Sequence, residues 1–383
     1  MWFFIFQQLK KRGHYWFFVF WAYFYCFWGN YERAALLLQN LAEREKISAK
    51  LWGKLGDLYF RLGKYSLARK AFLHGLKGKQ KKCQFLFRLG QIEEAINNLT
   101  FAQNIYLKCL TKEESAVEVL LSLGNLLFRL GNFEQAITYY YRLIGLDITS
   151  AEIYNNLGIC HLKLGGLTLA ASFLKKAAVR KPKDPNIICN YALVFIKKAA
   201  YREALLLLQK VKKFKQVRVY SFLGYCYSLL GEYRQGLACY QEVLALEPTN
   251  RDNLVNLACT YAHLGEYQKA RSILQKLLII IPHDPELLNN LAWVYEAIND
   301  YETAEKNYYR GLALAPRHPE LNYNLICCLF KQQKYYEAWE KIIFLKNMPE
   351  WKDKAWAAFA HLYENMGEEK LAVDCYNKAY GLN

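Results

Sequence analysis

The chain has 383 residues, of which 54% are hydrophobic and 22% are charged, and its 51 Lys and Arg residues exceed its 34 Asp and Glu residues to give a formal net charge of +17. This composition excludes an intrinsically disordered chain, because disordered segments are too polar to bury a core. With only eight prolines and no low-complexity linker, the sequence favours one continuous folded array.

Residues 1–28 are the least typical stretch. Residues 1–14 combine an apolar run with the basic patch QQLKKRGH, and the fourteen residues from Tyr15 to Trp28 carry no charge. A membrane-spanning helix needs about 20 apolar residues, so this run is short for a span, although it suits a signal-type apolar region. Three interpretations stay open: a first helix that also touches a membrane or partner, a plain buried helix, and a true anchor or signal. The candidate membrane-contact residues are Trp16, Phe17, Phe18, Phe20, Trp21, Phe24, Phe27 and Trp28.

A small residue recurs along the whole chain in 34-residue steps, with one step of 32. The members of this column are Ala34, Ala68, Ala102, Ala136, Ala170, Ala204, Gly236, Ala270, Ala304, Ala338 and Ala372. Only Ala or Gly lets two helix backbones approach closely, so the column predicts a repeated helix crossing. A companion column of Ala and Gly lies 12 residues earlier in each unit, and Ile326 is its one misfit. We expect the packing around Ile326 to differ.

The clearest pair of units is RDNLVNLACTYAHLGEYQKARSILQKLLIIIPHD followed by PELLNNLAWVYEAINDYETAEKNYYRGLALAPRH. Each has two apolar runs at helical spacing, separated by a short break, and therefore predicts a helix–turn–helix repeat. Repeats are predicted to start near residues 15, 49, 83, 117, 151, 185, 217, 251, 285, 319 and 353. In the ambiguous unit 83–116, the 34-residue spacing places the turn at Asn97-Asn98. The unit 185–216 is two residues short, and we expect a local change of twist there.

These units resemble the tetratricopeptide repeat family, whose marks are a Leu-Gly or Leu-Ala pair and a Tyr in the first helix, a small residue in the second, and a Pro at the exit. The resemblance covers nearly the whole chain. It implies an all-α, right-handed superhelix of about eleven repeats over residues 15–383, with a concave groove lined by the first helices. It also implies a non-enzymatic scaffold whose partners are proteins.

Asparagine dominates one column of the predicted groove. The residue two positions before the companion column is Asn156, Asn190, Phe222, Asn256, Asn290 or Asn324, and Asn155 and Asn289 are adjacent. An amide both donates and accepts hydrogen bonds, so such a ladder can hold the backbone of an extended peptide. The arrangement resembles the asparagine ladder of the O-linked N-acetylglucosamine transferases, although Asn is frequent at this column throughout the family. Phe222, Tyr225 and Trp293 are predicted to add apolar pockets. A carboxylate clamp is disfavoured, because Leu121 and Asn186 stand where its lysines would be.

Positive charge is concentrated before residue 285. Residues 285–383 carry 11 Lys and Arg against 14 Asp and Glu. The basic clusters are Lys77, Lys79, Lys81 and Lys82; Lys175, Lys176, Arg180, Lys181 and Lys183; and Lys210, Lys212, Lys213, Lys215 and Arg218. They fit solvated helix ends first, anionic lipid or an acidic protein next, and nucleic acid least, because no nucleic-acid-binding motif is present.

The eleven cysteines are odd in number and contain no CxxC, which favours reduced thiols and a cytoplasmic location. A signal anchor would conflict with this, because Lys10, Lys11 and Arg12 would stay inside and send the repeats out. We therefore predict a cytoplasmic protein, with membrane association through the N-terminal apolar segment as the open alternative.

No catalytic, metal or cofactor motif is present: HExxH, GxGxxG, GxxxxGK[ST], GxSxG and zinc-spaced Cys/His sets are all missing. The sequence therefore predicts no enzyme activity, no cofactor and no metal. The favoured function is a scaffold that binds peptide segments of partner proteins in the groove. The alternatives are a membrane-tethered assembly or adaptor factor anchored through residues 1–28 and an RNA-binding repeat protein. Self-association is also left open.

Overall fold

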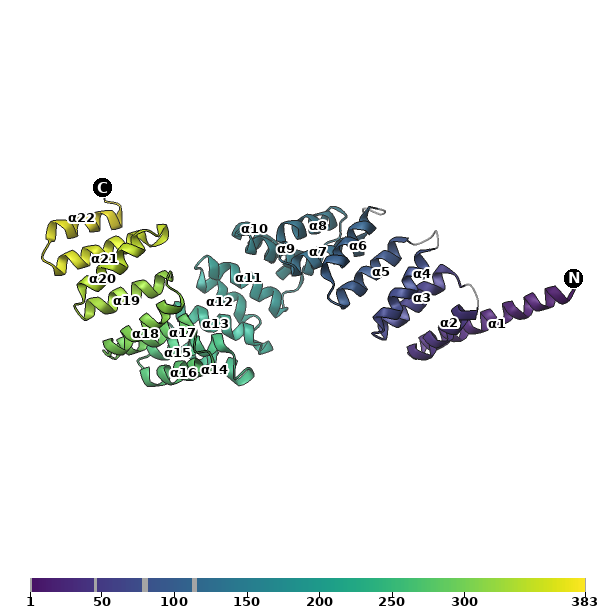
Figure 1. Cartoon of the computed structure of the whole chain (residues 1–383), viewed down its shortest axis with the longest axis horizontal. Coiled ribbons are helices and arrows are strands. Elements are labelled where there is room, and N and C mark those ends of the chain that lie inside the picture. Colours follow the sequence, from purple (N-terminus) through teal and green to yellow (C-terminus); the bar gives the residue numbers. More distant parts are fainter. Residues whose placement is uncertain (1, 45–46, 78–81, 112–115, 383) are drawn as a thin grey trace. The chain divides into compact units, whose positions relative to one another are not determined.

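The computed structural model describes residues 2–44, 47–77, 82–111 and 116–382, with backbone only for residues 2–14 and 44 (Figure 1). These residues form 22 α-helices and two short 3-10 helices, and the described ranges contain no strand. The chain divides into two compact units, residues 1–182 and 183–383, which we describe one at a time.

The first unit is a stack of five helix pairs. In each pair the two helices pack against each other, and the second helix contacts the first helix of the next pair. The helices are α1 (Trp2–Phe27), α2 (Tyr31–Arg44), α3 (Ala49–Arg61), α4 (Tyr65–Leu76), α5 (Lys82–Ala95), α6 (Leu99–Leu110), α7 (Val117–Arg129), α8 (Phe133–Gly145), α9 (Ala151–Lys163) and α10 (Leu167–Arg180). The predicted boundary at residue 14 falls inside α1.

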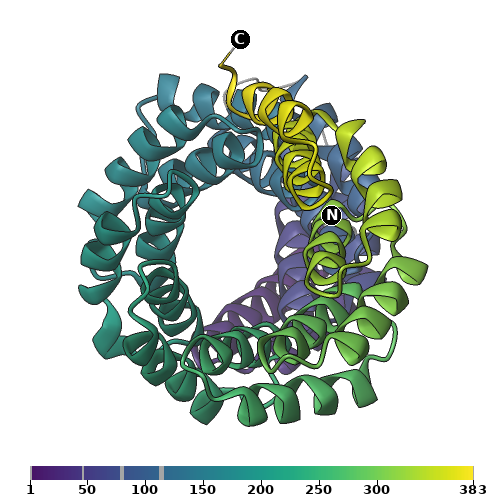
Figure 2. The ribbon, with the colours of Figure 1, turned by 90° about the vertical axis from the view of Figure 1, so that its left-hand side faces the viewer.

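The second unit repeats this arrangement in six pairs. In Figure 2 its helices, teal to yellow, lie in two layers. The helices are α11 (Pro185–Lys197), α12 (Tyr201–Gln209), α13 (Val217–Leu229), α14 (Tyr233–Leu246), α15 (Arg251–His263), α16 (Tyr267–Ile280), α17 (Pro285–Ala297), α18 (Tyr301–Leu314), α19 (Pro319–Lys331), α20 (Tyr335–Lys346), α21 (Lys352–Asn365) and α22 (Glu369–Tyr380), with 3-10 turns η1 (Lys212–Phe214) and η2 (Pro349–Trp351).

Each turn inside a pair contains one residue in the left-handed conformation. Seven of these residues are glycines, and the other four are Asn97, Ala199, Asn299 and Gln333, with φ between 55° and 64°. The backbone N–H of the following residue then returns to the first helix, as when Asn98 N donates to Glu93 O at 2.7 Å. The turn predicted at Asn97-Asn98 is therefore confirmed.

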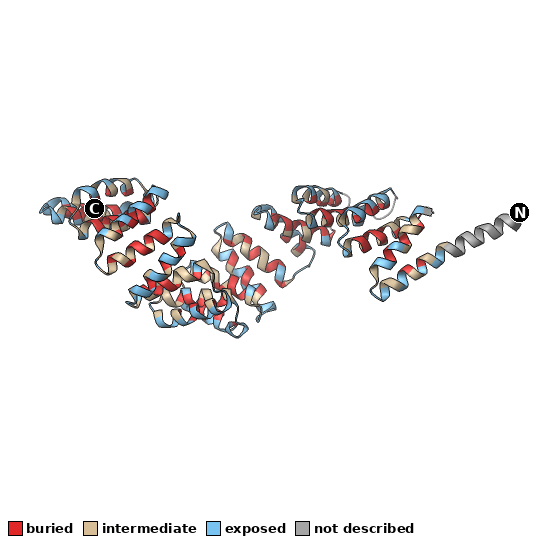
Figure 3. Ribbon diagram, turned by 60° about the horizontal axis from the view of Figure 1, so that its bottom comes forward, coloured by how far each residue is buried: buried red, intermediate tan, exposed pale blue. Residues whose placement is uncertain are grey.

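The small-residue column lies in the core. Its ten alanines are at most 2% exposed, and Gly236 is also buried. Figure 3 shows the buried residues on the helix faces that meet inside each unit. A Cβ atom at Gly56 would lie 2.7 Å from the ring of Phe72, and one at Gly224 would lie 2.7 Å from the ring of Tyr240. The absence of a side chain at these glycines makes room for a large residue 16 positions later.

Ile326 packs differently, as expected. The residue 16 positions later is Ile342 rather than an aromatic residue, and both isoleucines are fully buried in one cluster. In the preceding repeat the same two positions hold Ala292 and Tyr308, which are also fully buried. A larger residue in the first helix is therefore matched by a smaller one in the second, which keeps the packed volume similar.

The sixth repeat, residues 185–216, is two residues shorter than the neighbouring repeats, and the difference lies in its second half. Helix α12 has only 9 residues and is followed by the 3-10 turn η1, and Lys215 then takes φ of 47° to start the next repeat. The shortening is thus confined to the second helix and its exit, while the first helix α11 keeps 13 residues.

The prediction that all thiols are reduced is wrong for one pair. Cys83 at the start of α5 and Cys109 at the end of α6 form a disulfide. The two helices run antiparallel, so residues 26 apart in sequence come to have Cα atoms 5.0 Å apart. The cytoplasmic location loses this support and stays a prediction, because disulfides are typical of oxidising compartments. The other nine cysteines are free, and burial raises the pKa of Cys160 and of Cys226 to about 12.

Candidate peptide-binding groove

First helices of successive repeats lie next to each other in the second unit, where α11 contacts α13 and α13 contacts α15. Between these three helices lies a groove of about 870 Å³. Its apolar lining consists of Leu193, Ile196, Val217, Phe222 and Tyr225, and its polar lining of Lys197, Arg218, Ser221, Glu247, Asn250, Asp252, Asn253 and Asn256. Three of these residues, Phe222, Tyr225 and Asn256, were predicted from the sequence as binding residues.

Phe222 is held in place by its neighbour one helical turn earlier. The guanidinium of Arg218 lies 5.4 Å from the centre of the Phe222 ring, which is cation–π distance. Arg218 Nη2 also donates a hydrogen bond to Asn190 Oδ1 at 2.6 Å, so the arginine joins α11 to α13. Asn190 is 6% exposed, and its amide oxygen serves this internal contact.

Unlike Asn190, Asn256 lines the groove with a side-chain amide that is not engaged in an internal contact among the described residues. The residue is partly exposed, and its side-chain amide has no hydrogen-bond partner within the described part of the chain. Tyr225, 41% exposed, lies in the same groove. An aromatic surface and a free amide are therefore available side by side.

The sequence reasoning missed Asn250 and Asn253. Asn250 caps α15: its Oδ1 accepts hydrogen bonds from Asn253 N at 3.2 Å and from Asn253 Nδ2 at 2.7 Å. Asn253 is 4% exposed, and its Oδ1 has no hydrogen-bond partner among the described residues. The sequence signal was an N-cap residue followed three positions later by another polar residue where the helix pattern expects burial.

Two predicted ladder residues, Asn155 and Asn156, lie in the first unit and belong to an internal network. Asn156 Nδ2 donates to Asn125 Oδ1 at 3.2 Å and to the hydroxyl of Tyr140 at 3.1 Å, and Asn155 Nδ2 donates to Asn156 Oδ1 at 3.2 Å. Tyr140 in turn donates to Asn125 Oδ1 at 2.7 Å. Burial raises the pKa of Tyr140, so its hydroxyl keeps the proton that this network uses.

The remaining ladder residues lie further along the second unit. Asn324 Nδ2 donates to Asn289 Oδ1 at 2.9 Å, and Asn289 is 8% exposed, so this pair joins α17 to α19. Asn290 is partly exposed. The predicted ladder is thus discontinuous, because several of its amides bond to each other or to neighbouring side chains.

Trp293 lies outside the groove, at the end of a run of three rings in contact, with its plane tilted by 50° from that of His263. Its ring centre is 4.9 Å from that of His263, and His263 stacks on Tyr233 at 4.6 Å. Burial lowers the pKa of His263, so its ring is neutral at neutral pH and packs as an aromatic surface. The structure therefore separates Trp293 from Phe222 and Tyr225.

The predicted membrane-contact residues divide between the two faces of α1. Phe18 packs against the core of the first unit and Trp21 is partly buried, whereas the other six candidates are exposed. Within the described residues, no helix has both the length and the apolar character needed to cross a bilayer. The described residues also hold no cluster of His, Cys, Asp and Glu suited to a metal ion.

Profiles of the tetratricopeptide repeat family match residues 29–78, 84–151, 121–185, 217–250, 249–317 and 353–383. The chain belongs to the tetratricopeptide repeat family. The predicted family and fold class are confirmed. Tetratricopeptide repeat proteins generally mediate protein–protein interactions and are typically non-catalytic. No curated protein matches this sequence.

Solved structures share this tetratricopeptide repeat fold at low identity. The APC/C hetero-tetramer Cut9–Hcn1 is 16% identical, with a TM-score of 0.51, over 94% of this chain and 86% of that one. The C-terminal part of a repeat protein from Cytophaga hutchinsonii is 20% identical, with a TM-score of 0.53, over 62% and 98%. A monomeric IFIT1 with m7Gppp-AAAA is 15% identical, with a TM-score of 0.50, over 94% and 89%. At these identities the likeness concerns the fold alone.

Proposed function

We propose that this tetratricopeptide repeat protein is a non-enzymatic scaffold that binds an extended segment of a partner protein in the groove over α11, α13 and α15. The observation that carries the proposal is Phe222. This residue replaces asparagine in its column, and its half-buried ring lines a groove instead of filling the core. Aromatic anchors of this kind supply much of the binding energy of protein interfaces.

Different side chains of the groove contact different parts of the ligand. Phe222, with Leu193 and Ile196, offers an apolar floor for one or two side chains of the ligand. The free amide of Asn256 can donate to a backbone carbonyl and accept from a backbone N–H. Because Arg218 already holds the Phe222 ring, little side-chain freedom is lost when the ligand binds.

Charges of both signs border the groove. Lys197 lies at the end of α11, and Glu247 lies before α15. Asp252 lies at the start of α15, where it pairs with Arg251 at 2.8 Å. A peptide with a basic group at one end and an acidic group at the other complements this rim in one direction only. We therefore propose a directional ligand of mixed charge with a central apolar residue.

The test uses peptides selected from a random phage-displayed library against the full chain. Fluorescence anisotropy then compares the affinity of each synthetic peptide for the wild type, for the double variant Phe222→Ala/Tyr225→Ala, and for Tyr336→Ala. The double variant should bind at least about tenfold more weakly, as expected for loss of aromatic anchors. Tyr336 is 81% exposed on α20 and serves as the matched control.

The result contradicts the proposal if selected peptides bind the double variant with full affinity while its circular dichroism spectrum matches the wild type. A library that yields no binder to the wild type also contradicts it. If the control variant loses affinity to the same extent, the peptides do not recognise the groove.

Single asparagine variants distinguish this groove from a long ladder. The sequence hypothesis predicts that replacing Asn256, Asn290 and Asn324 together with Ala weakens binding without changing the melting curve. If the groove is the site, Asn256→Ala alone should reproduce most of the loss. Asn324→Ala should instead act on stability, because it removes the hydrogen bond to Asn289. Equal losses of affinity from both single variants would favour the ladder.

RNA binding stays a prediction. It is supported by the net charge, but Lys79 and Lys81 of the first basic cluster lie outside the described residues, and Arg218 of the third is engaged with Phe222 and Asn190. The IFIT1 structure holds a capped RNA, which is a property of that protein. The test is the affinity for single-stranded RNA across salt concentrations, where phosphate contacts produce a steep logarithmic decline.

A further inference from the structure

Seven exposed aromatic residues form one continuous stripe along α1. They occur at helical spacing, and their exposed fractions range from 40% for Phe24 to 84% for Phe27. The stripe consists of Trp16, Phe17, Phe20, Tyr23, Phe24 and Phe27 of α1 and of Trp28, which directly follows the helix. Its rings also contact one another, as Phe24 and Trp28 do with centres 6.3 Å apart, and Phe27 and Trp28 at 5.8 Å. A contiguous aromatic surface of this kind marks an interaction site.

The opposite face of α1 is already used for folding. Val19 and Ala22 are buried in the core of the first unit, at 8% and 1% exposure. Tyr15, Phe18 and Tyr25 pack partly against the same core. The stripe therefore takes no part in the packing of its own repeat, and α1 has two apolar faces, of which only one is buried.

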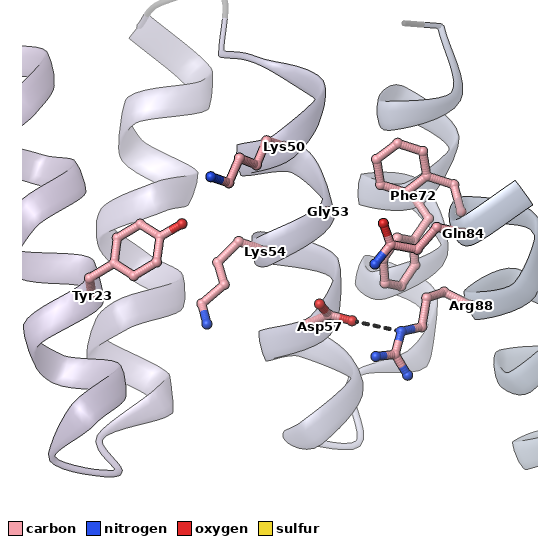
Figure 4. A pocket seen from close by; sticks show the side chains of 9 residues that line it. Tyr23, Lys50, Gly53, Lys54, Asp57, Phe72, Gln84 and Arg88 are labelled. Carbon is pink, nitrogen blue, oxygen red and sulfur yellow. Dashed lines mark ion pairs between the residues drawn. The ribbon is translucent and has the colours of Figure 1, made fainter. Parts of the chain in front are cut away.

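Cations border the stripe, and acids are missing from it. The first acidic residue of the sequence is Glu32, beyond the end of α1. Figure 4 shows Tyr23 of the stripe facing Lys54 of α3, whose Nζ lies 5.4 Å from the ring centre, with Lys50 one turn earlier. The nearby Asp57 carboxylate is bound to Arg88 Nε at 3.1 Å. Neither lysine has an ion pair within the described residues.

The aromatic stripe could bind either a second copy of the chain or a lipid surface, and the net charge of this part of the chain favours the lipid surface. Residues 1–111 contain 18 Lys and Arg against 6 Asp and Glu. Two such segments placed face to face would repel each other, and α1 has no carboxylate to pair with the lysines of a partner copy. An anionic bilayer attracts the same charges, and Trp and Tyr side chains prefer the region between lipid headgroups and acyl chains.

We propose that α1 lies flat on an anionic lipid bilayer, with the aromatic stripe inserted at the depth of the headgroups and the lysines of α3 against lipid phosphates. The helix binds the surface without crossing it, as interfacial helices with one apolar face do. The peptide groove belongs to the other unit, so this proposal stands independently of the proposed function.

The test is flotation of the full chain with phosphatidylcholine vesicles, with and without phosphatidylglycerol. The wild type should float with the anionic vesicles and much less with the neutral ones. The triple variant Trp16→Ser/Phe20→Ser/Phe27→Ser should lose at least about tenfold in partitioning, because it removes most of the inserted apolar surface. The matched control is Phe214→Ser/Tyr336→Ser/Tyr380→Ser, which removes three exposed aromatic residues of the second unit.

The electrostatic part has its own readout. The double variant Lys50→Glu/Lys54→Glu should reduce the preference for anionic vesicles, and added salt should reduce it in the wild type. Equal flotation with neutral and anionic vesicles would overturn the lipid charge assignment.

Sedimentation velocity separates the two occupants. The proposal is overturned in favour of a second copy if the wild type is a dimer that the triple stripe variant dissociates, and if neither protein floats with vesicles. It is also overturned if the wild type and the stripe variant float equally while both keep the same helical content.

Discussion

The ring of Tyr106 lies over Gly90, so closely that a Cβ atom at Gly90 would be 2.3 Å from ring atom Cε1. Tyr106 is fully buried, and its ring cannot retreat into solvent. This contact joins α5 to α6, and the same kind of contact lies between Gly224 and Tyr240.

Gly90→Ala should therefore destabilise the first unit by about 1–3 kcal/mol through overpacking. Gly124→Ala should cost less, because its Cβ would lie 3.0 Å from Tyr140. Urea denaturation followed by circular dichroism measures both. The control is Gly145→Ala, which meets nothing within 4 Å in α8 and should be neutral or stabilising. Equal stability of all three variants would mean that the close approach does not exist.

At two turns of the second unit, replacement of the present residue by glycine should raise the folding stability. Ala199 and Gln333 adopt φ of 55° and 59°, a conformation that costs a residue with a Cβ about 1–2 kcal/mol. Ala199→Gly and Gln333→Gly should each stabilise the second unit by roughly 1 kcal/mol, less the entropy that glycine adds to the unfolded chain. Gly265→Ala should do the reverse, since Gly265 has φ of 79°. A loss of stability from Ala199→Gly in thermal unfolding would contradict this assignment.

Acid should weaken the ion pair between Glu152 and Lys181. The hydrogen bond from Lys181 lowers the pKa of Glu152 to about 2. The pKa of Glu152 in the unfolded chain is near 4.5, so the folded state binds the proton less readily than the unfolded state does. The ion pair therefore contributes to folding stability above pH 4.5, and this contribution is lost as the pH falls toward about 2. In the Glu152→Gln variant, this part of the loss of folding stability at low pH should be absent. Because the pair is half-exposed, we expect a small effect. Parallel stability profiles of the variant and the wild type between these pH values would contradict it.

The disulfide between Cys83 and Cys109 gives a chemical test of the first unit. Alkylation of the denatured, unreduced chain should label nine thiols, the number of free cysteines. Reduction, or the double variant Cys83→Ser/Cys109→Ser, should cost roughly 2–4 kcal/mol by releasing a loop closed over 26 residues. Labelling of all eleven thiols in protein isolated under oxidising conditions would show that the bond does not form.

The repeat architecture could be predicted from residue spacing alone. The column of small residues from Ala34 to Ala372 predicted the helix crossing inside each pair, including the pair with the ambiguous turn at Asn97-Asn98, because a close crossing excludes larger side chains. Spacing along one chain was enough for these features, since they depend on contacts within a single repeat.

The roles of particular polar and aromatic side chains follow from contacts that only the folded chain makes. The hydrogen bond from Arg218 to Asn190, the hydrogen bond from Asn324 to Asn289 and the contact of the Trp293 ring with the His263 ring all join different repeats. The same is true of α1, where sequence alone could not separate the face that packs on the core from the exposed stripe, because both faces are aromatic. The residues that join different repeats lie roughly 30 positions apart and meet between the first helices of neighbouring repeats. Which of them pair depends on the exact placement of neighbouring helices, which a repeating pattern does not encode.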